Sequence, residues 1–259
     1  MSLVITRVAG LATIQDLGRP GRMHEGLPRG GALVPALLAR ANRAAGNPDD
    51  TAAIEIFGQL AVRAEQDITV GTDAGSQRLR AGEELELGSE PSRVAYLAMR
   101  GGTNTPIILG SRSAHLSAGL GDPLRAGDAI AVGDAAMAET PILPFVAPEM
   151  IRVVRGPDRQ AFSRKAIEAL ESGPYCILPA SDRVGTRLSG PVLERTAALD
   201  VSRPMVRGAI EIPTDGQPIV LGAEHPTTGG YPVVAVIVSD DLDAFHAIRI
   251  GGSVTFIAS

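Results

Sequence analysis

The chain has 259 residues, 44% of them hydrophobic and 20% charged, which is typical of a globular protein and argues against a disordered one. Its single cysteine, Cys176, excludes an internal disulfide and a zinc site built from several cysteines. The net charge is −5 with acidic and basic residues interspersed, which argues against nucleic acid as a partner.

In chain order, the sequence predicts many short strands and three helices. Alternating or β-branched runs indicate strands at residues 2–8, 66–71, 93–99, 151–154, 218–222 and 233–238. Helices are predicted at residues 34–45, 158–171 and 240–247, the last with Ser239 as its N-cap. Glycine and proline separate these elements at short intervals, which is typical of β-barrels and sandwiches.

Two internal matches indicate a duplicated architecture. Residues 79–88 (LRAGEELELG) resemble residues 124–133 (LRAGDAIAVG), and a longer match pairs residues 58–73 with residues 208–224. The prolines of residues 139–148 predict an extended linker. We therefore predict a mainly β protein with a few short helices and two related β-barrel subdomains, at residues 1–138 and 149–259.

Two polar regions of the first half are candidate binding loops. In the first, Asp16 and Arg19 lie among turn glycines, where an arginine can hold a carboxylate through paired hydrogen bonds. In the second, the backbone amides around Gly101 and Gly102 are expected to form an anion nest to which Arg112 adds charge. For each region the alternative is a loop with a purely structural role.

The second half supplies two further candidates. In residues 181–191, Asp182 is expected to orient Arg183 or Arg187; the alternative is a surface ion-pair cluster. Residues 215–232 run from an apolar strand into a polar loop, where Gln217 is a candidate partner for an amide group. The loop residues expected to cradle a polar group are Thr227, Thr228, Gly229, Gly230 and Tyr231, and the alternative is a glycine-bearing hairpin. Because the histidines show no metal-ligand spacing, no metal is expected.

The ordered set of motifs resembles the biotin-dependent carboxyltransferase A/B family, whose members include allophanate hydrolase subunit 2, KipA and the C subunit of 5-oxoprolinase. The motifs are TIQDxGR at 13–19, GSRS at 110–113, SDRxGxRLxGP at 181–191, DGQPI at 215–219 and TTGGYP at 227–232. They extend over nearly the whole chain. The chain departs from the family at His225-Pro226, where the resemblance leads us to expect an Arg-Gln pair.

The resemblance implies two cyclophilin-like β-barrels, the first A-like and the second B-like. It also implies a role as the C subunit of a 5-oxoprolinase-like, ATP-dependent amidohydrolase that opens 5-oxoproline to glutamate. The partners would be a KipI-like B subunit, similar to allophanate hydrolase subunit 1, together with an A subunit. The chain would be inactive alone, hold no covalent cofactor and meet ATP only through the complex.

Within that picture the candidate residues have the following expected roles. Arg112, Arg183 and Arg187 would hold a carboxylate or phosphate. Gln217, Thr227 and Thr228 would bind the lactam or amide, and Tyr231 would form an apolar wall with a polar tip. Catalytic residues stay unassigned.

Two other interpretations remain open. In the first, the chain is half of a carboxyltransferase acting on urea or a similar amide, with carboxybiotin supplied by a separate protein. In the second, it is a KipA-like antagonist of a kinase inhibitor, without catalysis. The amino terminus has no signal-peptide layout and no apolar run is long enough for a bilayer, so we expect a cytoplasmic protein.

Overall fold

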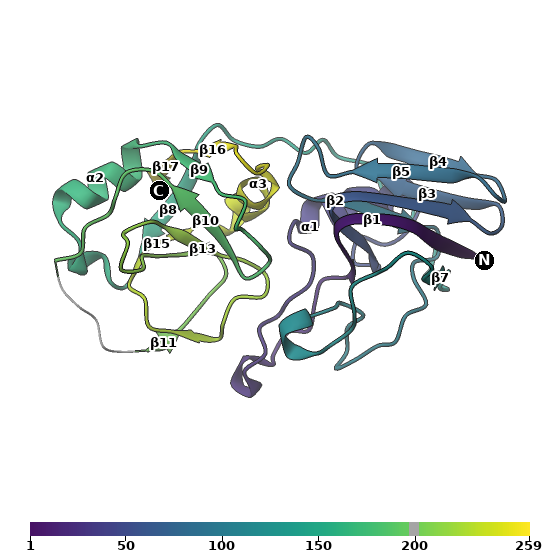
Figure 1. Cartoon of the computed structure of the whole chain (residues 1–259), viewed down its shortest axis with the longest axis horizontal. Helices are drawn as coiled ribbons and strands as arrows, with labels where there is room; N and C mark the ends of the chain where they lie inside the picture. The colour runs from purple at the N-terminus through teal and green to yellow at the C-terminus, as the bar shows by residue number, and fades with distance from the viewer. Residues whose placement is uncertain (197–201) are drawn as a thin grey trace. The chain divides into compact units, whose positions relative to one another are not determined.

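The structure is a computed structural model that describes residues 1–196 and 202–259. By its internal contacts the chain divides into two units (Figure 1). The first comprises Met1–Pro20 and Gly30–Phe145, and the second comprises Gly21–Arg29 and Val146–Ser259. A short segment from early in the chain is therefore grouped with the second unit. The subdomain boundaries given above stay a prediction.

The first unit contains one antiparallel sheet of seven strands, which differ in length. Its strands are β1 (Ser2–Gln15), β2 (Ala53–Ala64), β3 (Ile68–Thr72), β4 (Gly75–Leu79), β5 (Glu84–Gly88), β6 (Ala95–Met99) and β7 (Ala129–Ala131). The hydrogen-bonded order is β4-β3-β6-β2-β1-β7, and β5 also pairs with β2. The buried core combines apolar residues from these strands, among them Leu3, Ile54 and Leu97.

Helix α1 (Pro35–Ala45) lies against β3, β4 and β6. Its close approach requires Gly71, since a Cβ there would stand 2.2 Å from the carbonyl oxygen of Ala41. The helix ends at Gly46, whose φ of 80° is left-handed, as helix C-caps favour. The predicted helix at residues 34–45 is therefore confirmed to within one residue. A short 3-10 helix, η2 (Leu116–Ala118), follows later in the unit.

The shorter internal match corresponds to two equivalent turns within the first unit. In one, the Glu83 carboxylate accepts the backbone N–H of Arg80 at 2.8 Å; in the other, the Asp128 carboxylate accepts that of Arg125 at 2.7 Å. Each turn leads into a strand: β5 pairs with β2, and β7 pairs with β1. The match therefore reflects a repeated turn inside one unit and does not relate the two units to each other.

The second unit contains an eight-stranded, barrel-like sheet. Its strands are β8 (Ile151–Arg155), β9 (Tyr175–Ile177), β10 (Gly185–Ser189), β12 (Ala209–Glu211), β13 (Ile219–Leu221), β15 (Val233–Ile237), β16 (Ser253–Val254) and β17 (Phe256–Ala258). They pair in the order β16-β9-β10-β13-β12-β15-β8-β17. The longer internal match falls on strands with different pairing, because β12 and β13 are neighbours whereas β2 and β3 are not. Both units are mainly β, as predicted.

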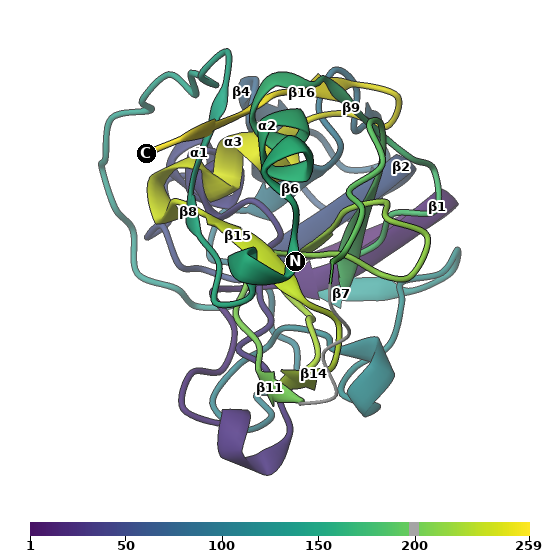
Figure 2. The ribbon, with the colours of Figure 1, turned by 90° about the vertical axis from the view of Figure 1, so that its left-hand side faces the viewer.

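A two-stranded ribbon of β11 (Arg203–Pro204) and β14 (Thr228–Gly229) forms a separate small sheet of the second unit (Figure 2). Arg203 forms an ion pair of 2.7 Å with the buried Asp158 carboxylate. The other oxygen of that carboxylate accepts the backbone N–H of Val233 at 2.9 Å. Asp158 thus fastens the ribbon to the end of β15.

The remaining helices begin later than the sequence predicts. The predicted helix at 158–171 is a 3-10 turn, η3 (Arg159–Ala161), followed by α2 (Arg164–Ser172), which Ser163 caps by accepting the N–H of Ala166. The predicted helix at 240–247 is a 3-10 turn, η4 (Ser239–Asp241), followed by α3 (Leu242–Ala247), and Ser239 does not cap it. In both cases an aspartate of the expected first turn serves elsewhere. Asp158 holds the ribbon, and Asp241 binds the Arg152 guanidinium at 2.6 Å.

The second unit also contains the 3-10 turn η1 (Met23–Glu25). In the part of the chain that the structure describes, no helix combines the length and apolar character needed to span a bilayer.

Candidate functional site

Asp16 organises the loop at residues 108–113 of the first unit. Its Oδ1 atom accepts hydrogen bonds from the hydroxyls of Ser111 and Ser113, both at 2.6 Å, and from the Gly18 N–H at 2.7 Å. Its Oδ2 atom accepts the backbone N–H of Arg112 at 2.7 Å. A carboxylate with four donors is fully engaged, so Asp16 acts as a support that fixes this loop.

Arg19 supports the same loop from inside the protein. Its side chain is buried, and its guanidinium donates to the backbone carbonyls of Ser113 at 2.6 Å and Ile108 at 3.3 Å. Burial of an arginine is expensive unless its donors are satisfied, and these carbonyls accept from it. The structure thus places both secondary candidates, Asp16 and Arg19, behind the loop that carries Arg112.

Arg112 lines two cavities of the first unit. One, of about 250 Å³, is polar and also bounded by Thr51, Thr103 and Asp134. The other, of about 340 Å³, is bounded by apolar residues such as Ile14 and Leu124. Nearby Leu109 has a φ of 54°, a left-handed conformation that non-glycine residues rarely adopt and that often marks functional loops.

The expected anion nest at Gly101 and Gly102 does not form. The Gly101 N–H donates to Oδ1 of Asn47 at 2.9 Å, and the Gly102 N–H donates to the Met99 carbonyl at 2.8 Å. Both amides are thus hydrogen-bonded within the protein, one to a side chain and one in a backbone turn, so they do not form an anion nest. Both glycines still line the polar cavity beside Arg112 through their backbone.

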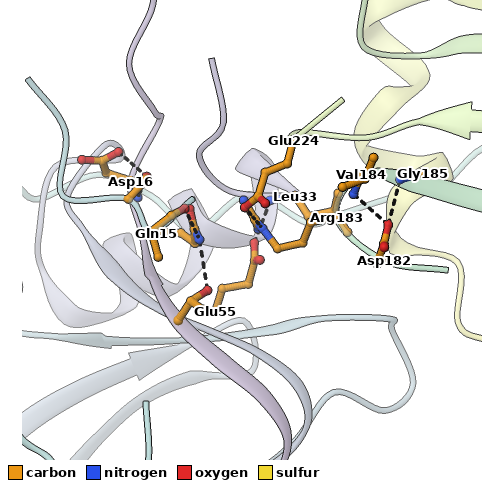
Figure 3. Close-up of polar contacts among 12 residues, drawn as sticks. Gln15, Asp16, Leu33, Glu55, Asp182, Arg183, Val184, Gly185 and Glu224 are labelled. Carbon is orange, nitrogen blue, oxygen red and sulfur yellow. Dashed lines mark hydrogen bonds and ion pairs between the residues drawn. The ribbon is translucent and has the colours of Figure 1, made fainter. Parts of the chain in front are cut away.

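In the second unit Asp182 shapes the turn that leads into β10. Its Oδ1 atom accepts the backbone N–H groups of Val184 and Gly185, both at 2.9 Å (Figure 3). This is an Asx-type turn, in which a short acidic side chain replaces a backbone acceptor. Both of these contacts go to backbone amides, and the orientation of Arg183 or Arg187 by Asp182 stays a prediction.

Arg183 is buried and its charge is balanced. Its Nε atom donates to Oε1 of Glu224 at 2.6 Å, and the Arg183 carbonyl accepts the Glu224 N–H at 3.0 Å. The two side chains are 4% and 5% exposed. The neighbouring His225 is also buried, which lowers the pKa of its imidazole, while a hydrogen bond to the Pro226 carbonyl acts in the opposite direction.

Arg187 is exposed on the outer face of the barrel-like sheet. In the ladder it pairs with Ile219 of β13, and Ile219 pairs with Glu211 of β12. The row beside it, Thr186–Val220–Ile210, contains core residues, so Arg187, Ile219 and Glu211 share the opposite face. Glu211 is only 8% exposed; burial raises the pKa of its carboxyl, and the positive charge of Arg187 acts against that rise.

Gln217 uses both ends of its amide to hold the backbone of Gly190. Its Oε1 atom accepts the Gly190 N–H at 3.0 Å, and its Nε2 atom donates to the Gly190 carbonyl at 3.3 Å. This pair of bonds joins the ends of two adjacent loops. Gln217 therefore has a structural contact, and its predicted role as a partner for an amide or lactam stays a prediction.

The loop at residues 227–231 belongs to the ribbon. Thr228 pairs with Pro204 and Gly229 with Arg203, while Thr228, Gly230 and Tyr231 are exposed, Tyr231 at 47%. A Cβ on Gly229 would stand 2.3 Å from the terminal methyl of Met205, so the ribbon packs closely on this side chain, which would have to move to admit a larger residue. The ribbon presents hydroxyls and an aromatic ring to its surroundings.

The structure therefore brings together part of the predicted set in each unit. In the first unit, Asp16 and Arg19 hydrogen-bond the loop that contains Arg112. In the second unit, Asp182 hydrogen-bonds the backbone at the start of β10, and Gln217 hydrogen-bonds the backbone just after its end. Sequence reasoning missed Glu211, Glu224 and Asp158. A lone carboxylate inside the apolar run Ala209-Ile-Glu-Ile212 is the signal that would have indicated Glu211.

Comparison with known proteins gives consistent matches. The family profile described as carboxyltransferase domain, subdomain A and B, matches residues 25–258. The chain is 32% identical to the C subunit of 5-oxoprolinase from Escherichia coli over 280 residues, covering 98% of this chain and 90% of that protein. It is 31% identical to the C subunit of 5-oxoprolinase from Haemophilus influenzae, covering 98% of this chain and 90% of that protein.

Solved structures match over nearly the whole chain as well. A crystal structure of the protein TTHA0988 superposes with a TM-score of 0.85 at 27% identity, covering 98% of this chain and 55% of that one. This chain thus spans about half of that protein. The fold is also that of a segment of K. lactis urea amidolyase, with a TM-score of 0.88 at 22% identity, covering 98% of this chain and 18% of that one.

Proposed function

This chain belongs to the family of the carboxyltransferase domain, subdomains A and B, and from that premise we propose that it is the C subunit of a 5-oxoprolinase-like amidohydrolase. The observation that carries the proposal is near-complete alignment, at 32% and 31% identity, with two proteins named as C subunits of 5-oxoprolinase. The complex would open the lactam of 5-oxoproline to give glutamate, with ATP. A KipI-like B subunit together with an A subunit would be its partners in the cytoplasm.

Several side chains of the described units suit this substrate. Arg112 in the first unit and Arg187 in the second are separate candidates for binding its carboxylate, because each is partly or fully exposed and guanidinium groups bind carboxylates in a paired geometry. Thr227 and Thr228 would bind the lactam carbonyl, with the Gly229 and Gly230 amides beside them, and Tyr231 would cover the ring. Arg183 would act through its pair with Glu224, which fixes the end of the preceding turn.

ATP chemistry belongs to the complex in this proposal. ATP would activate the lactam carbonyl, and this chain would bind and orient the substrate without holding a covalent cofactor. The chain alone would then be inactive.

Reconstitution tests the proposal. The chain is co-purified with its A and B partners, and release of glutamate from 5-oxoproline is measured with and without ATP. ATP-dependent release is the expected result. A stable three-component complex without turnover would reject lactam cleavage and favour a KipA-like regulatory role.

Carboxyl transfer to urea or a similar amide is the second candidate. It is favoured by the match to urea amidolyase of Lachancea kluyveri, which is 25% identical over 98% of this chain and 17% of that protein. Carboxybiotin would have to come from a separate protein. Transfer of label from carboxybiotin to urea, in a complex that does not release glutamate, would establish this candidate in place of the first.

A further inference from the structure

A cavity of about 550 Å³ lies within the second unit, between the end of β8 and the start of α2. Cavities of this size are typical of small-molecule sites, which combine apolar surface with a few polar groups. None of its lining residues takes part in the function proposed above. The side chains around it are Arg155, Arg159, Gln160, Phe162, Arg164 and Ile167.

The turn that leaves β8 is anchored on β15, which fixes the backbone beside two of the arginines. The Gly156 N–H donates to the Val234 carbonyl at 3.0 Å. A Cβ at Gly156 would stand 2.3 Å from the Val233 carbonyl oxygen, so this close approach requires glycine. Arg155 and Arg159 flank the anchored turn, so their backbone positions are set without a ligand.

Positive charge exceeds negative charge around the cavity. Arg159 pairs with Glu171 at 2.9 Å, and Arg164 pairs with Glu168 at 2.7 Å. In the part of the chain that the structure describes, no hydrogen bond or ion pair engages the exposed Arg155 guanidinium. The side chains of Arg164 and Glu168 are 94% and 60% exposed, and such exposed pairs are weak, so an incoming anion can replace the carboxylate. Two guanidinium groups are therefore open to an anion, with a third beside them.

One wall of the cavity is apolar. Phe162 and Ile167 belong to the buried core cluster of the second unit, and both also line the cavity. An apolar group placed against them would be removed from water, which is favourable, while an anionic group of the same molecule meets the arginines. The cavity thus combines an apolar wall with concentrated positive charge.

We propose that this cavity binds a small organic phosphate. The three arginines hold the phosphate group, and the organic part lies against Phe162 and Ile167. A phosphate monoester carries a charge of about −1.5 to −2 and has three strong acceptor oxygens, so it can accept hydrogen bonds from several guanidinium groups at once. A carboxylate has one charge and two oxygens, which a single arginine satisfies in a paired geometry. The number of arginines therefore favours phosphate, and the site does not depend on the proposed function.

Binding of simple probes by the full chain tests the site, with dissociation constants measured by calorimetry. The probes are phenyl phosphate, benzoate, which carries a carboxylate in place of the phosphate, and inorganic phosphate, which lacks the organic part. The variants are Arg155→Ala, Arg155→Lys and Arg164→Ala, all at exposed positions. Arg249→Ala, exposed in the same unit and outside the cavity lining, is the matched control.

The wild-type chain should bind phenyl phosphate about tenfold or more tightly than benzoate or inorganic phosphate. Arg155→Ala should weaken phenyl phosphate binding about tenfold, and Arg164→Ala about threefold because this side chain is more exposed to water. Arg155→Lys keeps the charge but loses the planar guanidinium, so its affinity should fall between those of wild type and Arg155→Ala. Arg249→Ala should behave as wild type.

ATP added as a competitor identifies the source of the phosphate group. Displacement of phenyl phosphate would indicate a nucleotide ligand, and no displacement would indicate another phosphate ester.

Three results would overturn the site. The first is a folded Arg155→Ala chain with wild-type affinity for phenyl phosphate, and the second is benzoate binding as tight as that of phenyl phosphate. The third is no binding of phenyl phosphate to the folded wild-type chain. In that case, weaker association of Arg155→Ala with the A and B partners would identify these arginines as a protein contact.

Discussion

The Nε atom of Arg183 donates a hydrogen bond of 2.6 Å to Oε1 of Glu224, and both side chains are at least nine-tenths buried. The arginine that the sequence motif marks as an anion ligand is thus already matched with a carboxylate of the same unit. The ion pair, together with the backbone hydrogen bond from the Glu224 N–H to the Arg183 carbonyl, joins the motif at residues 181–191 to the segment that follows β13. Loss of the Arg183–Glu224 ion pair should therefore reduce the stability of the fold more than it reduces ligand binding.

Glu224→Gln should destabilise the protein by about 3–5 kcal/mol, because the buried Arg183 guanidinium would lose the negative charge that balances it. Urea unfolding at neutral pH measures the change. The matched control is Glu168→Gln, which breaks the exposed pair with Arg164 and should cost about 0.5 kcal/mol or less. Equal losses of unfolding free energy in the two variants would show that the buried pair contributes no more to stability than the exposed one.

Asp16→Asn should release the loop at residues 108–113. The amide has one acceptor oxygen in place of two, so the hydroxyls of Ser111 and Ser113 and the Arg112 N–H compete for it. We expect a loss of at least about 2 kcal/mol and faster hydrogen exchange in this loop. Asp122→Asn, at an exposed carboxylate, is the control. Unchanged exchange in the loop would refute the supporting role of Asp16.

Gln217→Ala should cost about 1–3 kcal/mol of stability, since it leaves the N–H and carbonyl of Gly190 without their partner. Because its amide is engaged by Gly190, the dissociation constant for 5-oxoproline should change little in complexes that remain folded. Thermal unfolding and calorimetry separate the two effects. A large loss of affinity with unchanged stability would restore Gln217 as a direct ligand.

Glu211→Gln should stabilise the protein at neutral pH and not in acid. Burial raises the pKa of this carboxyl above its ordinary value of 4.5, so the folded state holds a proton more strongly than the unfolded state. The free energy of unfolding therefore falls as the pH rises from 4.5 through the raised pKa of the folded protein. The glutamine side chain does not titrate, so the variant does not lose this stability. Unfolding free energies at a series of pH values provide the measurement. A variant effect independent of pH would contradict the burial account.

Local sequence signals account for much of the fold. Pro35 and Gly46 delimit α1 because proline suits a first helical turn and glycine suits the left-handed cap. The alternating run that ends in Gly88 forms β5, preceded by the turn that Glu83 closes. These features depend on residues a few positions apart, which is the range in which sequence patterns are informative.

Long-range contacts account for what the sequence did not indicate. Asp158 and Asp241 look like helix-initiating residues, yet their carboxylates bind Arg203 and Arg152, which are distant in the chain. Likewise, Arg183 and Glu224 are 41 positions apart in the sequence, and nothing local relates them to each other. Only the strand order places them together, and strand order is a property of the whole sheet.

The most direct measurement is glutamate release from 5-oxoproline by the A and B partners as this chain is added back in increasing amounts. The account predicts no ATP-dependent release without the chain, a rise that saturates when the complex is complete, and a large loss of activity when the added chain carries Arg187→Ala. Full glutamate release by the A and B partners without this chain, or no release at any amount of added chain, would contradict the account.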